Sequence, residues 1–104
     1  MVRNQLLERV KEVVLTFDPH AKVILYGSRA RGDAAPDSDW DFLILLSVQL
    51  DWKLKSAIRK AVYAVELESD EILSTIIHNE QNWNEPVRRA SPLHEAVSRD
   101  GIAI

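Results

Sequence analysis

Hydrophobic residues recur at every third or fourth position in two stretches of the chain. This spacing predicts an amphipathic helix over residues 4–17 and a longer helix over residues 51–68. Asp18-Pro19 ends the first helix, because proline disfavours a helical conformation in the residue before it. Asp51 is placed to cap the start of the second helix. The chain is therefore expected to begin with one helix and to carry a second at its centre.

Continuous apolar runs, bounded by turn-forming residues, lie between and after these helices. They predict β-strands at residues 23–26, 40–46 and 72–77. In the second strand both faces are apolar after Asp41, so helices are expected to cover both faces of the sheet.

The C-terminal part of the chain predicts one more helix and an edge strand. Ser91 is a capping residue and Pro92 suits the first helical position, so a short helix begins there and Gly101 ends it. Residues 102–104 are expected to add a terminal edge strand. The order of the elements predicts an α/β domain around a small sheet. At 104 residues, the chain is expected to form one domain over residues 1–104.

Composition and charge exclude several classes of protein. The chain has no cysteine, which excludes disulfides and thiolate-zinc sites and fits a reducing cytoplasm. Its net charge of −3 argues against general nucleic-acid binding, which needs a basic stripe. The charged, amphipathic N-terminus does not resemble a signal peptide, and no apolar run approaches membrane-spanning length. We therefore expect a cytoplasmic protein without a membrane segment.

Residues 26–41, YGSRARGDAAPDSDWD, place charge at the start of the second predicted strand. Asp39 and Asp41 are two positions apart on a strand, so both carboxylates project from one face, about 6 to 7 Å apart at the backbone. Two anions this close resist joint ionisation unless a cation lies between them. Carboxylate oxygens suit Mg²⁺, which completes its shell with substrate phosphates. The pair is predicted to bind metal; the alternative is a strand-start pair that lies in solvent.

The turn before these aspartates has the features of a phosphate cradle. Gly27 lets the backbone approach a phosphate closely, and Ser28 adds a hydroxyl donor at the start of a one-turn helix over residues 28–31. Arg29 and Arg31 add charge-assisted donors, and because one turn can direct only one of them at the phosphate, Arg31 is favoured. A phosphate cradle beside a metal-binding carboxylate pair predicts phosphoryl or nucleotidyl transfer.

The pattern G-S-x10-D-x-D, in its strand-turn-strand context, resembles the signature of the DNA polymerase β-like nucleotidyltransferase superfamily. More narrowly, YGSRARGDAAPDSDWDFLILL resembles the minimal nucleotidyltransferases. The resemblance implies the polymerase β palm-like fold, a small mixed sheet flanked by helices. It implies that Gly27 and Ser28 hold the triphosphate of ATP or another nucleotide, with Arg29 or Arg31 neutralising phosphate charge. It further implies that Ser28, Asp39 and Asp41 are the catalytic residues, the two aspartates binding one or two Mg²⁺ ions.

One position departs from the family pattern. The family usually has a third carboxylate on the next strand, and the equivalent position here is expected to be Ser74. A serine cannot replace an ionised carboxylate as a metal ligand or base. Asp70 or Glu71, at the start of that strand, are the candidates to stand in for it.

The aromatic residues are interpreted as structural. Trp40 is expected in the core on the face away from the aspartates, Trp83 under the closing segment, and Trp52 partly buried on its helix. His78 and His94 are interpreted as packing or solvent residues.

The resemblance implies an adenylyl or other nucleotidyl transfer to a hydroxyl acceptor. Members of the family often pair with a HEPN-type toxin and act as its antitoxin, so a HEPN-type partner is the expected acceptor. The alternative is a non-catalytic nucleotide-binding antitoxin or regulatory subunit, which Ser74 favours. A transferase acting on a small molecule is a third hypothesis, and association with a second copy of the chain remains open.

Overall fold

The computed structural model describes residues 1–104 and contains one four-stranded sheet in the order β3-β2-β1-β4. Strands β1 (Lys22–Tyr26) and β2 (Trp40–Leu46) are antiparallel, whereas β2 and β3 (Leu73–Asn79) are parallel. The two-residue strand β4 (Ile102–Ala103) pairs antiparallel with β1. The sheet is therefore mixed, as the resemblance to the nucleotidyltransferases implied.

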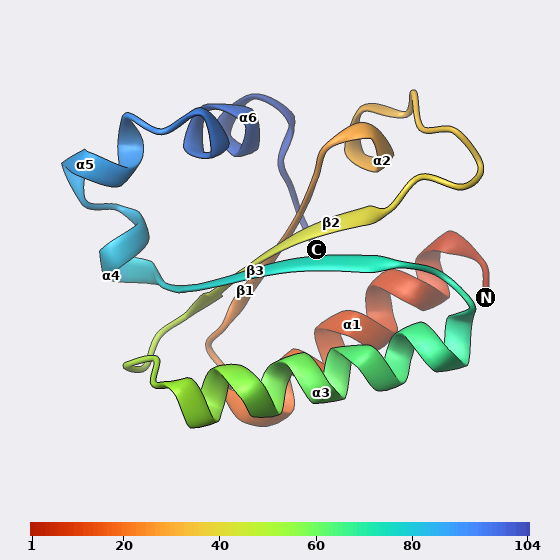
Figure 1. Ribbon diagram of the computed structural model, residues 1–104, viewed down its shortest axis with the longest axis horizontal. Helices are drawn as coiled ribbons and strands as arrows, with labels where there is room; N and C mark the ends of the chain where they lie inside the picture. The colour runs from red at the N-terminus through yellow and green to blue at the C-terminus, as the bar shows by residue number, and fades with distance from the viewer.

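Two long helices cover one face of the sheet (Figure 1). They are α1 (Arg3–Phe17) and α3 (Trp52–Ser69), and the predictions for both are confirmed to within a few residues. Asp51 caps α3 as predicted, its carboxylate accepting a hydrogen bond of 2.8 Å from the amide of Leu54. The larger part of the core lies between these helices and the sheet, and includes Phe42 and Ile44 of β2, both fully buried.

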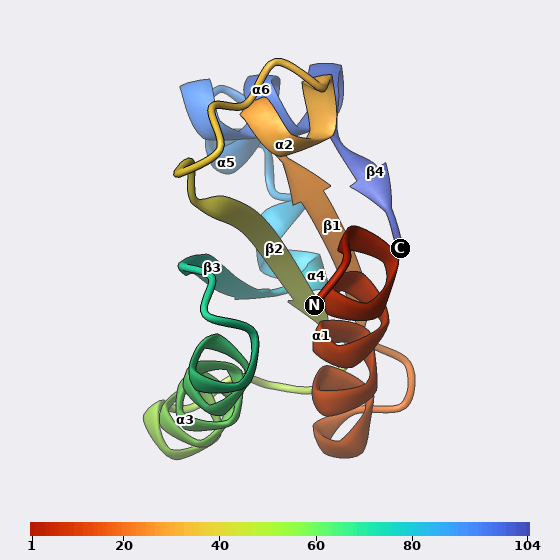
Figure 2. The same cartoon turned by 90° about the vertical axis from the view of Figure 1, so that its right-hand side faces the viewer.

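Shorter helices cover the other face (Figure 2). They are α4 (Glu80–Trp83), α5 (Pro86–Arg89) and α6 (Pro92–Asp100), of which α4 and α5 were not predicted, whereas α2 (Ser28–Arg31) follows the end of β1 and packs its Ala30 against the first cluster. A second core cluster forms here from Leu43 and Leu45 of β2, Trp83 of α4 and Val97 of α6. Both faces of β2 are thus covered, as its pattern predicted. None of the helices is both long and apolar enough to cross a membrane.

The prediction for Trp52 is wrong, because its side chain is 76% exposed. Trp52 precedes the buried Ile58 by six residues, which places it about 240° around the helix from the face that packs on the sheet. Trp40 and Trp83, in contrast, are 5% exposed and lie in the two core clusters, as expected. His78 and His94 pack around Trp83, with ring centroids 5.5 and 4.6 Å from it.

Candidate functional site

The site is built on the turn between β1 and α2. Gly27 has φ +75° and ψ −159°, and its carbonyl accepts hydrogen bonds of 3.1 Å from the amides of Ala30 and Arg31. Gly32 ends this single helical turn at φ +84°, in the left-handed conformation. Residues with a side chain rarely adopt either conformation, so the turn depends on both glycines.

The turn lies directly against the aspartate pair. Asp41 is opposite Tyr26 in the antiparallel register of β1 and β2, one residue before the turn. A Cβ atom at Gly27 would collide with the carboxylate oxygen Oδ2 of Asp41. The absence of a side chain therefore allows the carboxylate to lie against the backbone of the predicted phosphate cradle, and the two halves of the motif form one site.

The two carboxylates differ in exposure and influence each other. Asp39 is exposed, whereas Asp41 is half-buried. Burial raises the pKa of Asp41 above its ordinary value, the negative charge of Asp39 raises it further, and only Arg31 opposes these effects. Burial and the charge of Asp41 also raise the pKa of the Tyr26 hydroxyl. The positive charge that the protein places near Asp39 and Asp41 is therefore too small to balance their two negative charges.

This electrostatic arrangement fits a divalent cation. A bound Mg²⁺ ion would favour the ionised form of both carboxylates and would draw its remaining ligands from phosphate oxygens and water. Asp39 and Asp41 are the residues that would hold it. No group of three or more His, Cys, Asp or Glu side chains is arranged to hold a metal ion in the structure.

The two arginines of α2 have different surroundings. The Arg29 guanidinium donates hydrogen bonds of 2.9 and 3.3 Å to the Ser38 carbonyl and of 3.1 Å to that of Pro36. It also lies 4.5 Å from the centre of the Trp40 ring. Its donors are therefore engaged in holding the loop over residues 33–38, which leads into Asp39.

Arg31 is the arginine on the side of the carboxylates. Its guanidinium pairs with Asp33 at 3.1 Å and with Asp100 at 3.2 Å, and its charge lowers the pKa of Asp41. Its side chain remains 41% exposed, so it can exchange these partners for a phosphate. Asp100, which connects α6 to this turn, was not identified from the sequence, because nothing in the local pattern signals a contact between residues 69 positions apart.

The position of the third carboxylate is occupied by Ser74. In the parallel register of β2 and β3, Ser74 pairs with Asp41, as anticipated from the family pattern. Glu71 accepts a hydrogen bond of 3.1 Å from Trp40 Nε1, and Trp40 lies on the opposite face of the sheet from Asp41. Asp70 is the exposed C-cap residue of α3, with φ +58°. Neither acid stands in for the missing carboxylate in this arrangement.

Comparison with known proteins agrees with this geometry. The family described as the nucleotidyltransferase domain matches residues 7–96. MJ0141 of Methanocaldococcus jannaschii, a protein named for an inferred protein adenylyltransferase activity, is 36% identical over 76 residues, which are 71% of this chain and 77% of that protein.

Two solved structures share the fold at low sequence identity. A toxin–antitoxin structure with AMP-PNP aligns with a TM-score of 0.65 at 18% identity, over 92% of this chain and 69% of that one. A complex of a tri-AMPylated HEPN toxin of Shewanella oneidensis with its MNT antitoxin aligns with a TM-score of 0.63 at 15% identity, over 98% of this chain and 71% of that one. The glycine turn, the paired aspartates and these matches together show that the chain belongs to the nucleotidyltransferase domain family.

Proposed function

We propose that this protein is a Mg²⁺-dependent adenylyltransferase that transfers AMP from ATP to a hydroxyl group of a HEPN-type partner protein and acts as its antitoxin. The observation that carries the transferase assignment is the contact between the Gly27 turn and the Asp41 carboxylate. The choice of AMP and of a protein acceptor is supported by the name of the M. jannaschii relative. The choice of a HEPN-type partner is supported by the complex from S. oneidensis.

In the reaction, the acceptor oxygen forms a bond to the α-phosphorus while the bond from that phosphorus to the bridging oxygen breaks. Pyrophosphate leaves and the hydroxyl proton passes to solvent. Gly27 and Ser28 would hold the β- and γ-phosphates, and Arg31 would neutralise their charge. Asp39 and Asp41 would hold Mg²⁺, which when bound stabilises the negative charge on the reacting phosphates. We assign Arg29 to positioning the loop that carries Asp39, because its donors already bind carbonyls of that loop.

The absence of a carboxylate opposite Asp41 on β3 favours a second candidate, a nucleotide-binding antitoxin that does not transfer AMP. Ser74 occupies the paired position and cannot accept the acceptor proton as a carboxylate would. In this alternative the protein would bind ATP and Mg²⁺ and inhibit its partner through its surface alone.

One assay separates the two candidates. The protein is incubated with Mg²⁺, α-labelled ATP and the product of its neighbouring gene as the candidate partner, and label on that partner and release of pyrophosphate are measured. We expect both signals for the unmodified protein and their loss in Asp39→Asn and Asp41→Asn. Asp37→Asn is the matched control, since Asp37 is an exposed acid of the same loop. ATP binding without label on the partner would support the non-catalytic candidate, and no ATP binding would contradict both.

A further inference from the structure

Large apolar side chains are exposed along the outer side of α3. Trp52, Tyr63 and Leu67 are 76%, 57% and 71% exposed. Their separations of 11 and 4 residues correspond to rotations of about 20° and 40° around the helix axis, so the three side chains lie on one side of it. Scattered exposed apolar residues are ordinary on a protein surface, but a strip of them along one helix marks an interaction surface.

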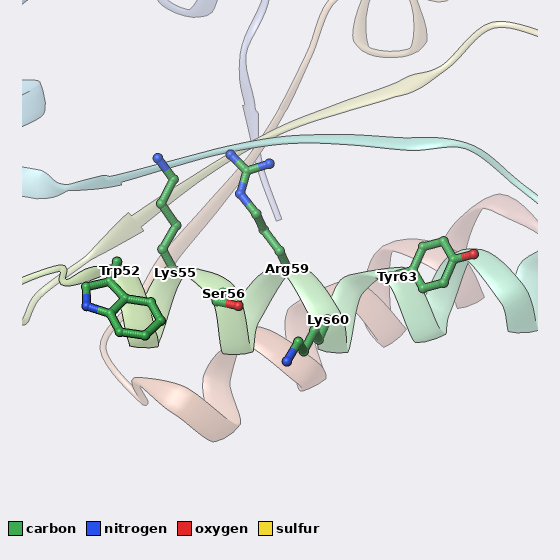
Figure 3. A pocket seen from close by; sticks show the side chains of 6 residues that line it. All are labelled: Trp52, Lys55, Ser56, Arg59, Lys60 and Tyr63. Carbon is green, nitrogen blue, oxygen red and sulfur yellow. The ribbon is translucent and has the colours of Figure 1, made fainter.

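Positively charged residues lie between the two aromatic residues of this strip. Trp52, Lys55, Ser56, Arg59, Lys60 and Tyr63 line a hollow of about 440 Å³, which we call the α3 patch (Figure 3). Lys55, Arg59 and Lys60 form no ion pair within the chain. The protein as a whole has a net charge of −3, so these three cations form a local positive surface on an acidic protein. They are available to pair with an acidic partner.

The charge distribution argues against a second copy of the chain as the partner. If two α3 helices packed antiparallel through these patches, residues 57 and 58 would lie at the two-fold axis, and Lys55 of each copy would face Lys60 of the other. These facing cations would repel each other.

A protein segment fits the patch better than a nucleic acid does. The apolar strip continues beyond the cations to Leu67, an aliphatic side chain that offers no flat surface on which a base could stack. Asp70, an exposed acid, follows Leu67 at the end of the helix and would repel a phosphate backbone continuing along it. The cationic surface is therefore short and bordered by apolar and acidic residues.

We propose that the α3 patch docks an acidic, amphipathic segment of a partner protein. Apolar side chains of that segment would pack on Trp52 and Tyr63, and its carboxylates would pair with Lys55, Arg59 and Lys60. The patch lies on a helix that covers the face of the sheet opposite Asp41 (Figure 1). A segment docked there leaves the Gly27 turn open, so this inference does not depend on the proposed transfer reaction.

The proposal can be tested with a fluorescent helical peptide that carries leucines on one side and glutamates beside them. Its binding to the full chain is measured by fluorescence anisotropy and located by amide chemical shifts. We expect Lys60→Glu to weaken binding by about tenfold, because an attraction becomes a repulsion. We expect Trp52→Ala to weaken it by about tenfold or more, as truncating an aromatic residue that anchors an interface does.

Lys11→Glu is the matched control, because Lys11 is also an exposed helical lysine without an ion pair. It lies about 200° around α1 from Arg9, the residue that contacts Glu68 of α3. The affinity of the Lys11→Glu variant for the peptide should equal that of the unmodified protein.

Four results would overturn the proposal. The first is no binding of the peptide, and the second is equal binding by the Lys60→Glu variant. The third is equal binding of a peptide with lysines in place of the glutamates. The fourth is a different partner for the patch. This would be seen either as tighter binding of a single-stranded RNA or as self-association of the chain, in each case abolished by Lys60→Glu.

Discussion

Replacing Gly27 with alanine should damage both the turn and the position of Asp41. At φ +75° and ψ −159°, Gly27 occupies a region that residues with a Cβ avoid, at a cost on the order of 1–3 kcal/mol. The new methyl group would also overlap the Asp41 carboxylate, which must then move or rotate away from its preferred rotamer. An off-rotamer side chain adds about 0.5–1.5 kcal/mol. The expected loss of unfolding free energy is therefore about 1.5–4.5 kcal/mol.

Gly32→Ala is the comparison variant. Gly32 also has a positive φ, +84°, but nothing lies within 4 Å of the position that its Cβ would occupy. Alanine at this position should suffer only the conformational cost of the left-handed region, about 1–2 kcal/mol. The difference between the two variants contains the collision with Asp41 and the extra cost of the backbone region of Gly27, whose ψ of −159° differs from the 11° of Gly32.

Urea unfolding followed by tryptophan fluorescence measures both values, and thermal unfolding checks them independently. A loss of 1 kcal/mol lowers the midpoint by about 4–8 °C in a domain of this size, so Gly27→Ala should melt about 6–36 °C lower than the unmodified protein. The variant should also lose nucleotide transfer, since a displacement of about 1 Å at a reacting site can cost about a hundredfold in rate. If Gly27→Ala is no less stable than Gly32→Ala, the close contact between the turn and Asp41 is refuted.

Two further predictions concern a buried carboxylate at the far end of β2 from the site and the arginine that binds the loop before Asp39. The Asp18 carboxylate, buried at 2% exposure, accepts hydrogen bonds of 2.7 and 2.8 Å from Ser47, and these hold its pKa below the ordinary value although burial alone raises it. The ionised Asp18 carboxylate therefore stabilises the protein above the unfolded pKa of about 3.9, and this stabilisation is lost as pH falls through the folded pKa. Asp18→Asn should lower the free energy of unfolding at pH 7 by about 1–3 kcal/mol. In urea titrations, the free energy of unfolding of the variant should also fall less steeply toward pH 2. An equally steep fall in the variant would contradict this. Arg29→Lys should lower the free energy of unfolding by about 1–2 kcal/mol, because lysine lacks the planar guanidinium that binds the loop carbonyls. It should also speed amide hydrogen exchange in residues 33–39. Unchanged exchange would show that Arg29 does not hold Asp39 in place.

The repeating patterns of the chain predicted most of the fold. Each predicted helix and strand exists, because hydrophobic periodicity and capping residues such as Asp51 and Ser91 act within a few positions. The helices α4 and α5 were missed, since each has only four residues and no periodicity can be read from so short a segment. The exposed position of Trp52 was also missed, because composition does not reveal which side of a helix faces the sheet at its first residue.

The sequence also identified the parts of the candidate site, and the tertiary structure determined how they meet. Gly27, Ser28, Asp39 and Asp41 are close in sequence, so their spacing alone indicated a phosphate cradle beside a carboxylate pair. The different roles of Arg29 and Arg31 depend instead on partners such as Asp100, which the folded chain brings in from 69 positions away.

The tertiary structure also determined whether another acid could replace the third carboxylate. Glu71 is near Ser74 in sequence, but it bonds to Trp40 on the far side of the sheet, since the faces of a strand alternate with every residue. Local sequence thus determined which groups are available for chemistry. Only the register of β2 and β3 decided which of them reach Asp41, because that register depends on packing across the whole sheet.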